Sequence, residues 1–198
     1  NIDNWARLCH APTIVGLKKA FGSGAMTNSI EEITSTQLIF LIGSNAAETH
    51  PVVGFKIKQA VAKGAVLIVA DPRKTELAEL ADYHLQLKPG TDIAVINAMA
   101  NVIVQEDIWD RDFVWERAKD FHSMRLGVKN CSPEWAEDVS GVSAEMIRQA
   151  AREYACSYTG MIFYTMGVTQ HAHGTEDVLS IANLALLVGK VGREFCGV

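Results

Sequence analysis

Leu38-Ile39-Phe40-Leu41-Ile42 is a continuous apolar run that ends at Gly43-Ser44-Asn45, and a second run, Val66-Leu67-Ile68-Val69-Ala70, ends at Asp71-Pro72-Arg73. Short apolar runs that are closed by turn residues are typical of strands buried on both faces. A helical pattern at residues 52–62 separates them, so the stretch has the order and size of a strand–helix–strand unit. This unit predicts parallel strands.

The rest of the chain continues the alternation of strands and helices. We expect a short helix at 75–80, strands at 83–87 and 161–164, and longer helices at 93–104, 143–155 and 178–188. The fold class predicted is therefore α/β, a doubly wound, mainly parallel, Rossmann-like sheet flanked by helices. The segment 107–140 is more polar. We expect it to pack against the rest of the domain through its aromatic residues, which are Trp109, Phe113, Trp115, Phe121 and Trp135.

Composition excludes several classes of protein. The 198 residues suffice for one large domain, and 18 basic against 23 acidic residues give a net charge of −5, without the basic stripe that duplex nucleic acid requires. No apolar window reaches the roughly 18 residues of a membrane span. We therefore expect no nucleic acid partner and no membrane span in this chain.

The four cysteines, Cys9, Cys131, Cys156 and Cys196, lack the spacing of a metal site or of a disulfide framework. They are interpreted as reduced thiols. Cys156 follows an apolar helical stretch and is expected in the core.

The turns after the predicted strands carry small or hydrogen-bonding residues. In doubly wound sheets, ligands bind at the carboxyl ends of the strands, where glycines let backbone N–H groups approach phosphate and carboxylates bind ribose or guanine. One such turn would be ordinary turn chemistry, but four predict a nucleotide-like ligand without naming it. No GxGxxG follows the first strand, so an ordinary NAD site is not supported.

Two N-terminal segments indicate which protein family the chain resembles. They are Ala6-Arg7-Leu8-Cys9-His10-Ala11-Pro12 and Gly22-Ser23-Gly24-Ala25-Met26-Thr27-Asn28. Together with the turns at 43–45, 71–73, 89–92 and 166–171, they resemble the catalytic subunit of molybdenum- or tungsten-dependent formate dehydrogenases. These enzymes belong to the molybdopterin oxidoreductase superfamily. The resemblance implies that residues 1–198 form one molybdopterin-guanine-dinucleotide-binding domain of a larger, multidomain subunit, with residues 1–36 carrying the metal-ligand segment.

The resemblance assigns the chemistry to two adjacent residues. Cys9 would ligate molybdenum or tungsten beside two molybdopterin guanine dinucleotides, which suits a soft thiolate. His10 would handle a proton or hydride equivalent or orient formate. Arg7 and His10 would make the surroundings positive and favour the thiolate. Without the resemblance, Cys9 is interpreted as a small buried apolar residue, and His10 as a histidine hydrogen-bonded to the backbone.

The resemblance also implies cofactor contacts in each turn. The first turn would meet phosphates and ribose through Gly43, Ser44, Asn45 and Glu48; the second would hold ribose or guanine through Asp71, Pro72 and Arg73. The third would meet guanine through Gly90, Thr91 and Asp92; the fourth would approach the pterin or diphosphate through Met166, Gly167 and Gln170. For Glu48 and Arg73, a solvated surface charge is an equal alternative. His171 and His173 lack a third ligand at metal spacing and are interpreted as loop or cofactor contacts.

The function implied is oxidation of formate to carbon dioxide, with two electrons passing to the metal and then to iron–sulfur centres. A four-iron, four-sulfur cluster is expected in an N-terminal domain absent from this chain, and iron–sulfur electron-transfer subunits are expected partners. This domain alone is expected to be inactive. Two alternatives stay open: a non-catalytic scaffold subunit of a respiratory complex, and another molybdopterin oxidoreductase such as a nitrate reductase. The expected compartment is the cytoplasm, with the periplasm open; the metal, the electron acceptor and the direction are not predicted.

Overall fold

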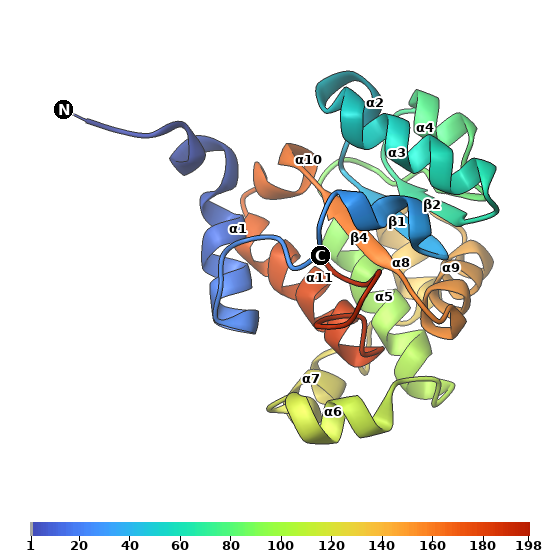
Figure 1. The fold of residues 1–198 in the computed structure, drawn as a ribbon. Helices are drawn as coiled ribbons and strands as arrows, with labels where there is room; N and C mark the ends of the chain where they lie inside the picture. Colours follow the sequence, from blue (N-terminus) through green and yellow to red (C-terminus); the bar gives the residue numbers. More distant parts are fainter. Residues whose placement is uncertain (1) are drawn as a thin grey trace.

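The structure, a computed structural model, describes residues 2–198 and is built on a four-stranded parallel sheet (Figure 1). The strands are β1 (Leu38–Ile42), β2 (Val66–Ala70), β3 (Tyr83–Leu85) and β4 (Met161–Tyr164), in the order β3-β2-β1-β4. β1 pairs in register with β2 from Leu38 opposite Val66 to Ile42 opposite Ala70. The predicted fold class is confirmed.

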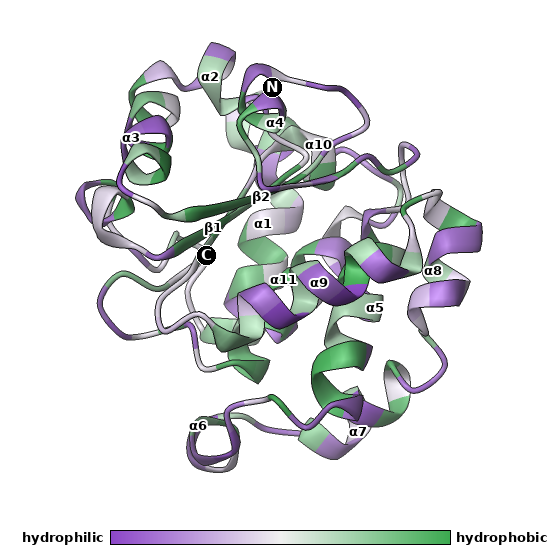
Figure 2. Cartoon of the chain, turned by 90° about the vertical axis from the view of Figure 1, so that its right-hand side faces the viewer, coloured by the Kyte–Doolittle hydropathy of each residue, from purple (hydrophilic) through white to green (hydrophobic). Residues whose placement is uncertain are grey.

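Helices cover both faces of this sheet because β1 and β2 bury side chains on both sides. Leu38, Phe40 and Ile42 point into the larger core, whereas Ile39 and Leu41 point into the smaller one. The smaller core is closed by the 3-10 helix η1 (Glu31–Ser35) and by α2 (Ala46–Thr49), α3 (Pro51–Ala62) and α4 (Glu76–Glu79). The larger core is closed by α1 (Trp5–Phe21), α5 (Asp92–Gln105), α8 (Pro133–Ser140), α9 (Ala144–Cys156) and α11 (Gly174–Leu187). Figure 2 shows these two helical layers on opposite sides of β1 and β2.

Two short helices, α6 (Arg111–Arg117) and α7 (Phe121–Gly127), form a lobe at one end of the larger layer, away from the sheet (Figure 1). Trp109 and Phe121 pack against the core, as predicted for this segment. Trp115 and Trp135 do not anchor it, because 70% and 41% of their surfaces stay exposed. Among the helices of residues 2–198, none has both the length and the apolar composition to cross a bilayer.

Three further differences from the sequence-based expectations have local causes. The third strand ends at Leu85 rather than at residue 87, because the backbone N–H of Leu87 turns back to the carbonyl of Leu85 (2.9 Å). The residues after β4 form a short helix, α10 (Met166–Thr169), instead of an open loop. The placement of Cys156 in the core was wrong, because this last residue of α9 faces solvent.

Candidate functional site

The carboxyl ends of β1, β2 and β4 surround a cavity of about 770 Å³, which we call the edge cavity. The first residues of α1 and the turn that precedes α5 complete its wall. Of the residues predicted for the site, the edge cavity brings together Cys9, His10, Gly43, Asn45, Asp71, Pro72, Arg73, Gly90, Asp92, Met166 and Gly167. Elements that are far apart in sequence thus converge at one edge of the sheet, as parallel strands require.

Four predicted residues do not line the edge cavity. Ser44 is buried in the turn after β1, while Glu48 on α2 is exposed to solvent, in agreement with its alternative as a surface charge. The hydroxyl of Thr91 donates to the carbonyl of Lys88 (2.6 Å), and Gln170 is exposed beyond α10. Which side of a turn a side chain faces depends on the turn geometry, and the residue pattern does not specify it.

Cys9 lies on α1, at the wall of the edge cavity. The helix begins at the cap residue Asn4, whose side chain accepts a hydrogen bond from the backbone N–H of Arg7 (3.0 Å). It kinks at His10, where φ is −135° and ψ is 19°. Cys9 is only 7% exposed, yet it borders the same cavity as Gly43 and Gly90. Cys9 therefore lies at the edge of the sheet that carries the glycine turns.

Arg7 and His10 do not give Cys9 the positive surroundings that the sequence predicted. Arg7 forms an ion pair with Asp3 (3.2 Å), and its side chain is 74% exposed, so its charge is compensated and solvated. Burial lowers the pKa of His10, and the nearby His50 lowers it further. His10 is therefore neutral at neutral pH, with its Nδ1 atom 3.1 Å from the Thr13 hydroxyl.

The turn after β1 contains buried polar atoms for which residues 2–198 supply no partner. Gly43 adopts a positive φ of 55°, and a Cβ atom there would lie 2.8 Å from the backbone of Gly167. Next to it, Ser44 Oγ and Asn45 Oδ1 are buried without a hydrogen bond from residues 2–198. Because buried polar atoms are nearly always bonded in folded proteins, this turn has the character of a ligand-binding segment.

The turn after β2 holds a buried carboxylate in a fixed position. Asp71 is 4% exposed, and its Oδ1 atom accepts a hydrogen bond from the backbone N–H of Arg73 (2.8 Å). Two side chains at or just beyond β3 fix the same turn: His84 donates to the carbonyl of Asp71, and Gln86 donates to that of Pro72, both at 3.0 Å. Such a turn presents a carboxylate with little freedom to move.

A second buried carboxylate lies where α5 begins. Asp92 is 3% exposed, and its Oδ2 atom is 3.7 Å from Nε2 of His171. Burial raises the pKa of Asp92, and burial together with the Asp92 charge raises the pKa of Asp177, on the first turn of α11, to about 6. The carboxylates of this corner therefore retain protons at pH values where exposed aspartates have lost theirs.

The edge cavity also contains residues that the sequence interpretation did not assign to the site. They are Trp5, Ala6, Thr49, His50, Pro89 and Thr165. His171, which the sequence interpretation treats as a loop or cofactor contact, also lines the edge cavity. His50 directly precedes Pro51, the first residue of α3, so it adjoins a helix start. Thr165 had no signal beyond its position at the end of a strand.

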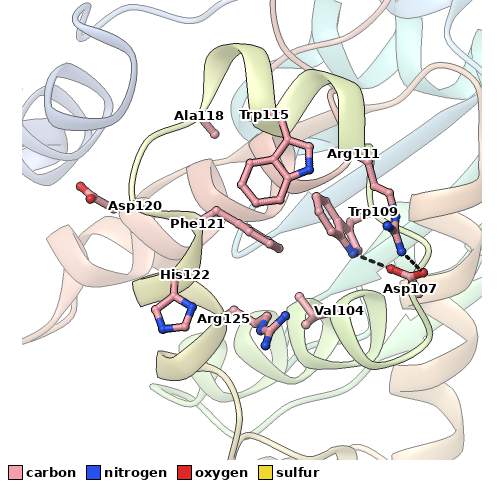
Figure 3. A pocket seen from close by; sticks show the side chains of 10 residues that line it. All are labelled: Val104, Asp107, Trp109, Arg111, Trp115, Ala118, Asp120, Phe121, His122 and Arg125. Atoms are coloured by element: carbon pink, nitrogen blue, oxygen red, sulfur yellow. Dashed lines mark hydrogen bonds and ion pairs between the residues drawn. The ribbon is translucent and has the colours of Figure 1, made fainter.

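A second cavity, of about 510 Å³, lies in the α6–α7 lobe, and we call it the aromatic pocket (Figure 3). Its rings are Trp109, Trp115 and Phe121, whose centroids are 4.4–6.1 Å apart. Asp107 accepts a hydrogen bond from Trp109 Nε1 (2.9 Å) and forms an ion pair with Arg111. The rings and the Asp107 charge are thus partnered within the lobe itself.

Comparison with known proteins matches the whole chain to one protein family. The family model described as "Molybdopterin oxidoreductase" matches residues 1–198. Formate dehydrogenase H of Escherichia coli is 46% identical over 198 residues, which are 100% of this chain and 28% of that protein. The F420-dependent formate dehydrogenase subunit alpha of Methanocaldococcus jannaschii is 44% identical over 100% of this chain and 29% of its own length.

The chain is also similar to proteins with other names. The assimilatory nitrate reductase catalytic subunit of Bacillus subtilis is 32% identical over 99% of this chain and 28% of that protein. Among solved structures, the acetylene hydratase from Pelobacter acetylenicus matches 98% of this chain and 26% of its own chain, with a TM-score of 0.89 and 26% identity. The chain thus spans less than a third of the length of each of these proteins.

Proposed function

The chain belongs to the molybdopterin oxidoreductase family, and from this membership we propose that it is the domain of a formate dehydrogenase that binds molybdopterin guanine dinucleotide. In this proposal Cys9 is the metal ligand and His10 is the proton-handling group for oxidation of formate to carbon dioxide. The observation that carries the proposal is that Cys9, His10 and the Gly43 turn line one cavity. The formate dehydrogenases among the relatives, at 44–46% identity over the whole chain, support the choice of substrate.

The residues of the edge cavity fit the cofactor. Asn45 Oδ1 is a buried acceptor without a partner among residues 2–198, and Asp71 and Asp92 are buried carboxylates suited to ribose hydroxyls and guanine N–H groups. Cys9 supplies the soft sulfur that molybdenum and tungsten favour. When bound, the pterin-held metal would supply the two-electron redox chemistry.

His10 is suited to accept a proton beside Cys9. Its lowered pKa keeps the imidazole neutral near pH 7, which is the form that a general base needs. The Thr13 hydroxyl, 3.1 Å from Nδ1, restrains the ring. Partial burial of His10 in the cavity wall also limits the water that competes for the proton.

The remaining parts of the proposal concern the larger enzyme. The relatives are more than three times as long as this chain, and we propose that their other domains supply the opposite wall of the site, a second dinucleotide and an iron–sulfur cluster. Iron–sulfur subunits would take the electrons. Because half a site neither orients formate nor excludes water, this domain alone is expected not to turn over formate. A cytoplasmic location is supported by four free cysteines.

The test compares two buried cysteines in the full-length protein. Cys9→Ser is expected to lower formate-driven dye reduction by at least about 100-fold and to reduce the bound molybdenum or tungsten, because the sulfur ligand is lost. Cys196→Ser is the matched control, since Cys196 is 1% exposed and adjoins Gly197, which bridges Met161 at the opposite end of β4. It should retain metal and activity. Equal behaviour of the two variants would overturn the proposal.

His10→Gln separates proton handling from metal binding. It is expected to retain the metal and to lose about 100-fold in kcat, because the amide accepts no proton in this range. Nitrate-driven oxidation of reduced dye by the unmodified protein, without formate activity, would instead assign the nitrate reductase alternative. A protein that holds no metal would indicate the scaffold.

A further inference from the structure

The short helix α10 connects two parts of the edge cavity that are distant in sequence. On one side, the Thr165 hydroxyl and the backbone N–H of Gly167 both donate to the carbonyl of Gly43, at 2.9 and 3.1 Å. On the other side, the Thr169 hydroxyl donates to the carbonyl of Cys9 at 2.7 Å. Five consecutive residues therefore tie the end of β1 to the segment of α1 that carries the thiol.

The bond from Thr169 reaches α1 next to its kink. His10, the next residue after Cys9, leaves helical geometry, and Pro12 within the helix has no N–H to donate. A buried hydroxyl from another element holds the Cys9 carbonyl at this kink, since Thr169 is 3% exposed. The backbone of Cys9 is thus fixed by a tertiary contact next to a break in its own helix.

Close backbone packing prevents α10 from sliding. A Cβ atom on Gly167 would lie 2.4 Å from the carbonyl oxygen of Gly43, and one on Gly174 would lie 2.5 Å from that of Thr169. Backbone approaches as short as these are possible only for glycine. The position of the Thr169 hydroxyl is therefore set by the Gly43 turn on one side and by α11 on the other.

We propose that Thr165, Gly167 and Thr169 form a clamp that sets the position of Cys9 relative to the Gly43 turn, with Thr169 as a positioning residue. The clamp couples the proposed metal ligand to the proposed dinucleotide-binding turn, so this inference rests on the proposed function. Its structural content, a restrained Cys9 backbone, is measurable without turnover.

The experiment uses three variants of the full-length protein. Thr169→Val removes the hydroxyl and keeps the shape of the side chain, whereas Thr169→Ser keeps the hydroxyl. Thr159→Val is the matched control, because Thr159 is 6% exposed and its hydroxyl accepts a hydrogen bond from the backbone N–H of Gln37 (2.9 Å) outside the edge cavity. Thermal unfolding of all three variants measures the general loss of stability.

The first readout is alkylation of Cys9 by iodoacetamide in the metal-free protein, followed by mass spectrometry and normalised to the exposed Cys156. Thr169→Val is expected to raise the relative rate about 5- to 10-fold, the factor that corresponds to loss of one hydrogen bond. Thr169→Ser and Thr159→Val should stay within about twofold of the unmodified protein on the same scale. An unchanged rate in Thr169→Val, or an equal increase in Thr159→Val, would overturn the clamp.

The second readout is the electron paramagnetic resonance spectrum of the metal in the loaded enzyme, with kcat and KM for formate. Thr169→Val is expected to shift the spectrum and to lower kcat more than it changes KM, and Thr169→Ser should restore both. Failure of the proposed function is distinguishable, because Cys9→Ser would then retain activity while the alkylation result still tests the clamp.

Discussion

The edge cavity and the aromatic pocket are both sizeable hollows, but they are built in opposite ways. The edge cavity gathers residues between Trp5 and His171 from several elements, whereas the aromatic pocket is formed by the single stretch from Val104 to Arg125 (Figure 3). In the aromatic pocket the rings contact one another in tilted or edge-to-face arrangements, and Asp107 binds both Trp109 and Arg111. In the edge cavity, Asn45 Oδ1 of the Gly43 turn is buried and has no partner among residues 2–198.

The two cavities differ less in volume than in whether their polar groups have partners. The aromatic pocket satisfies its own rings and the Asp107 charge, so its residues are interpreted as stabilising the lobe. The edge cavity contains Asn45 Oδ1, which is buried without a partner among residues 2–198, and the buried Asp92, whose charge influences the buried Asp177. Burial raises the pKa of both carboxyls, which costs stability unless a ligand offsets it. Substitutions in the edge cavity should therefore affect activity, whereas substitutions in the aromatic pocket should affect only the free energy of unfolding.

The largest effect is expected where backbone meets backbone at the edge cavity. Gly167→Ala places a methyl group 2.4 Å from the Gly43 carbonyl oxygen, and we expect it to lower the free energy of unfolding by about 3 kcal/mol and to abolish activity. Gly127→Ala, in α7 of the lobe, is the matched control, because nothing lies within 4 Å of its added Cβ. Urea unfolding should show no loss for that variant, and equal losses would contradict the contrast.

The next effect concerns the aromatic pocket itself. Trp109→Ala removes a ring 4.4 Å from that of Phe121 and is expected to lower the free energy of unfolding by about 2 kcal/mol. Formate-driven dye reduction by the folded protein should be unchanged. Trp115→Ala, at a 70% exposed ring, should cost less stability. Loss of turnover in a folded Trp109→Ala protein would show that the pocket serves the reaction.

A smaller effect depends on pH. The pKa of Asp177 is raised to about 6 in the folded protein, so the folded state binds this proton more tightly than the unfolded state, and its contribution to stability is lost as pH rises through 6. Asp177→Asn removes this loss, and its stability relative to the unmodified protein should increase by about 1 kcal/mol between pH 5 and pH 8.

Denaturant unfolding at both pH values measures that difference. Asp92, His171, His173 and Glu176 influence the same titration, and their charges should leave the sign unchanged. A difference that is independent of pH would contradict the raised pKa. Asp112→Asn on α6, whose carboxylate is exposed in the lobe, serves as the control.

The smallest effect is expected for the charge of the aromatic pocket. Arg111→Ala breaks an ion pair with Asp107 and a contact of 5.4 Å with the Trp109 ring, both at the surface. The loss should be about 0.5 kcal/mol at low salt and should decrease at high salt, because exposed pairs are screened. Thermal unfolding in low and high salt measures it; a loss that salt does not change would indicate packing instead.

The sequence predicted the sheet better than the helix that carries the thiol. The limits of β1, β2 and β4 agree with the apolar runs at 38–42, 66–70 and 161–164, because strands buried on both faces leave an uninterrupted apolar signal. No comparable signal marks α1, which contains Pro12 and has no acidic residue in its first turn. Its position depends on packing against α11, where a Cβ on Gly16 would lie 2.6 Å from Val178.

The sequence predicted which turns surround the edge cavity, but not which of their side chains line it. Glycine and carboxylate at the carboxyl ends of parallel strands identified Gly43, Asp71 and Asp92, because the direction of the chain fixes where each strand ends. The same pattern could not tell that Thr91 turns away or that His50 turns in. These orientations depend on short-range backbone geometry, and the roles proposed for Cys9 and His10 stay predictions.

The strand order has a consequence for biosynthesis. β1 is complete once residue 42 has been made, but the strand that covers its second edge, β4, begins only at Met161. Throughout the intervening translation, the central strand exposes an unpaired hydrogen-bonding edge, a known hazard for association between nascent chains. The contact from α10 to Cys9 requires residue 169, so the edge cavity too is completed late in translation.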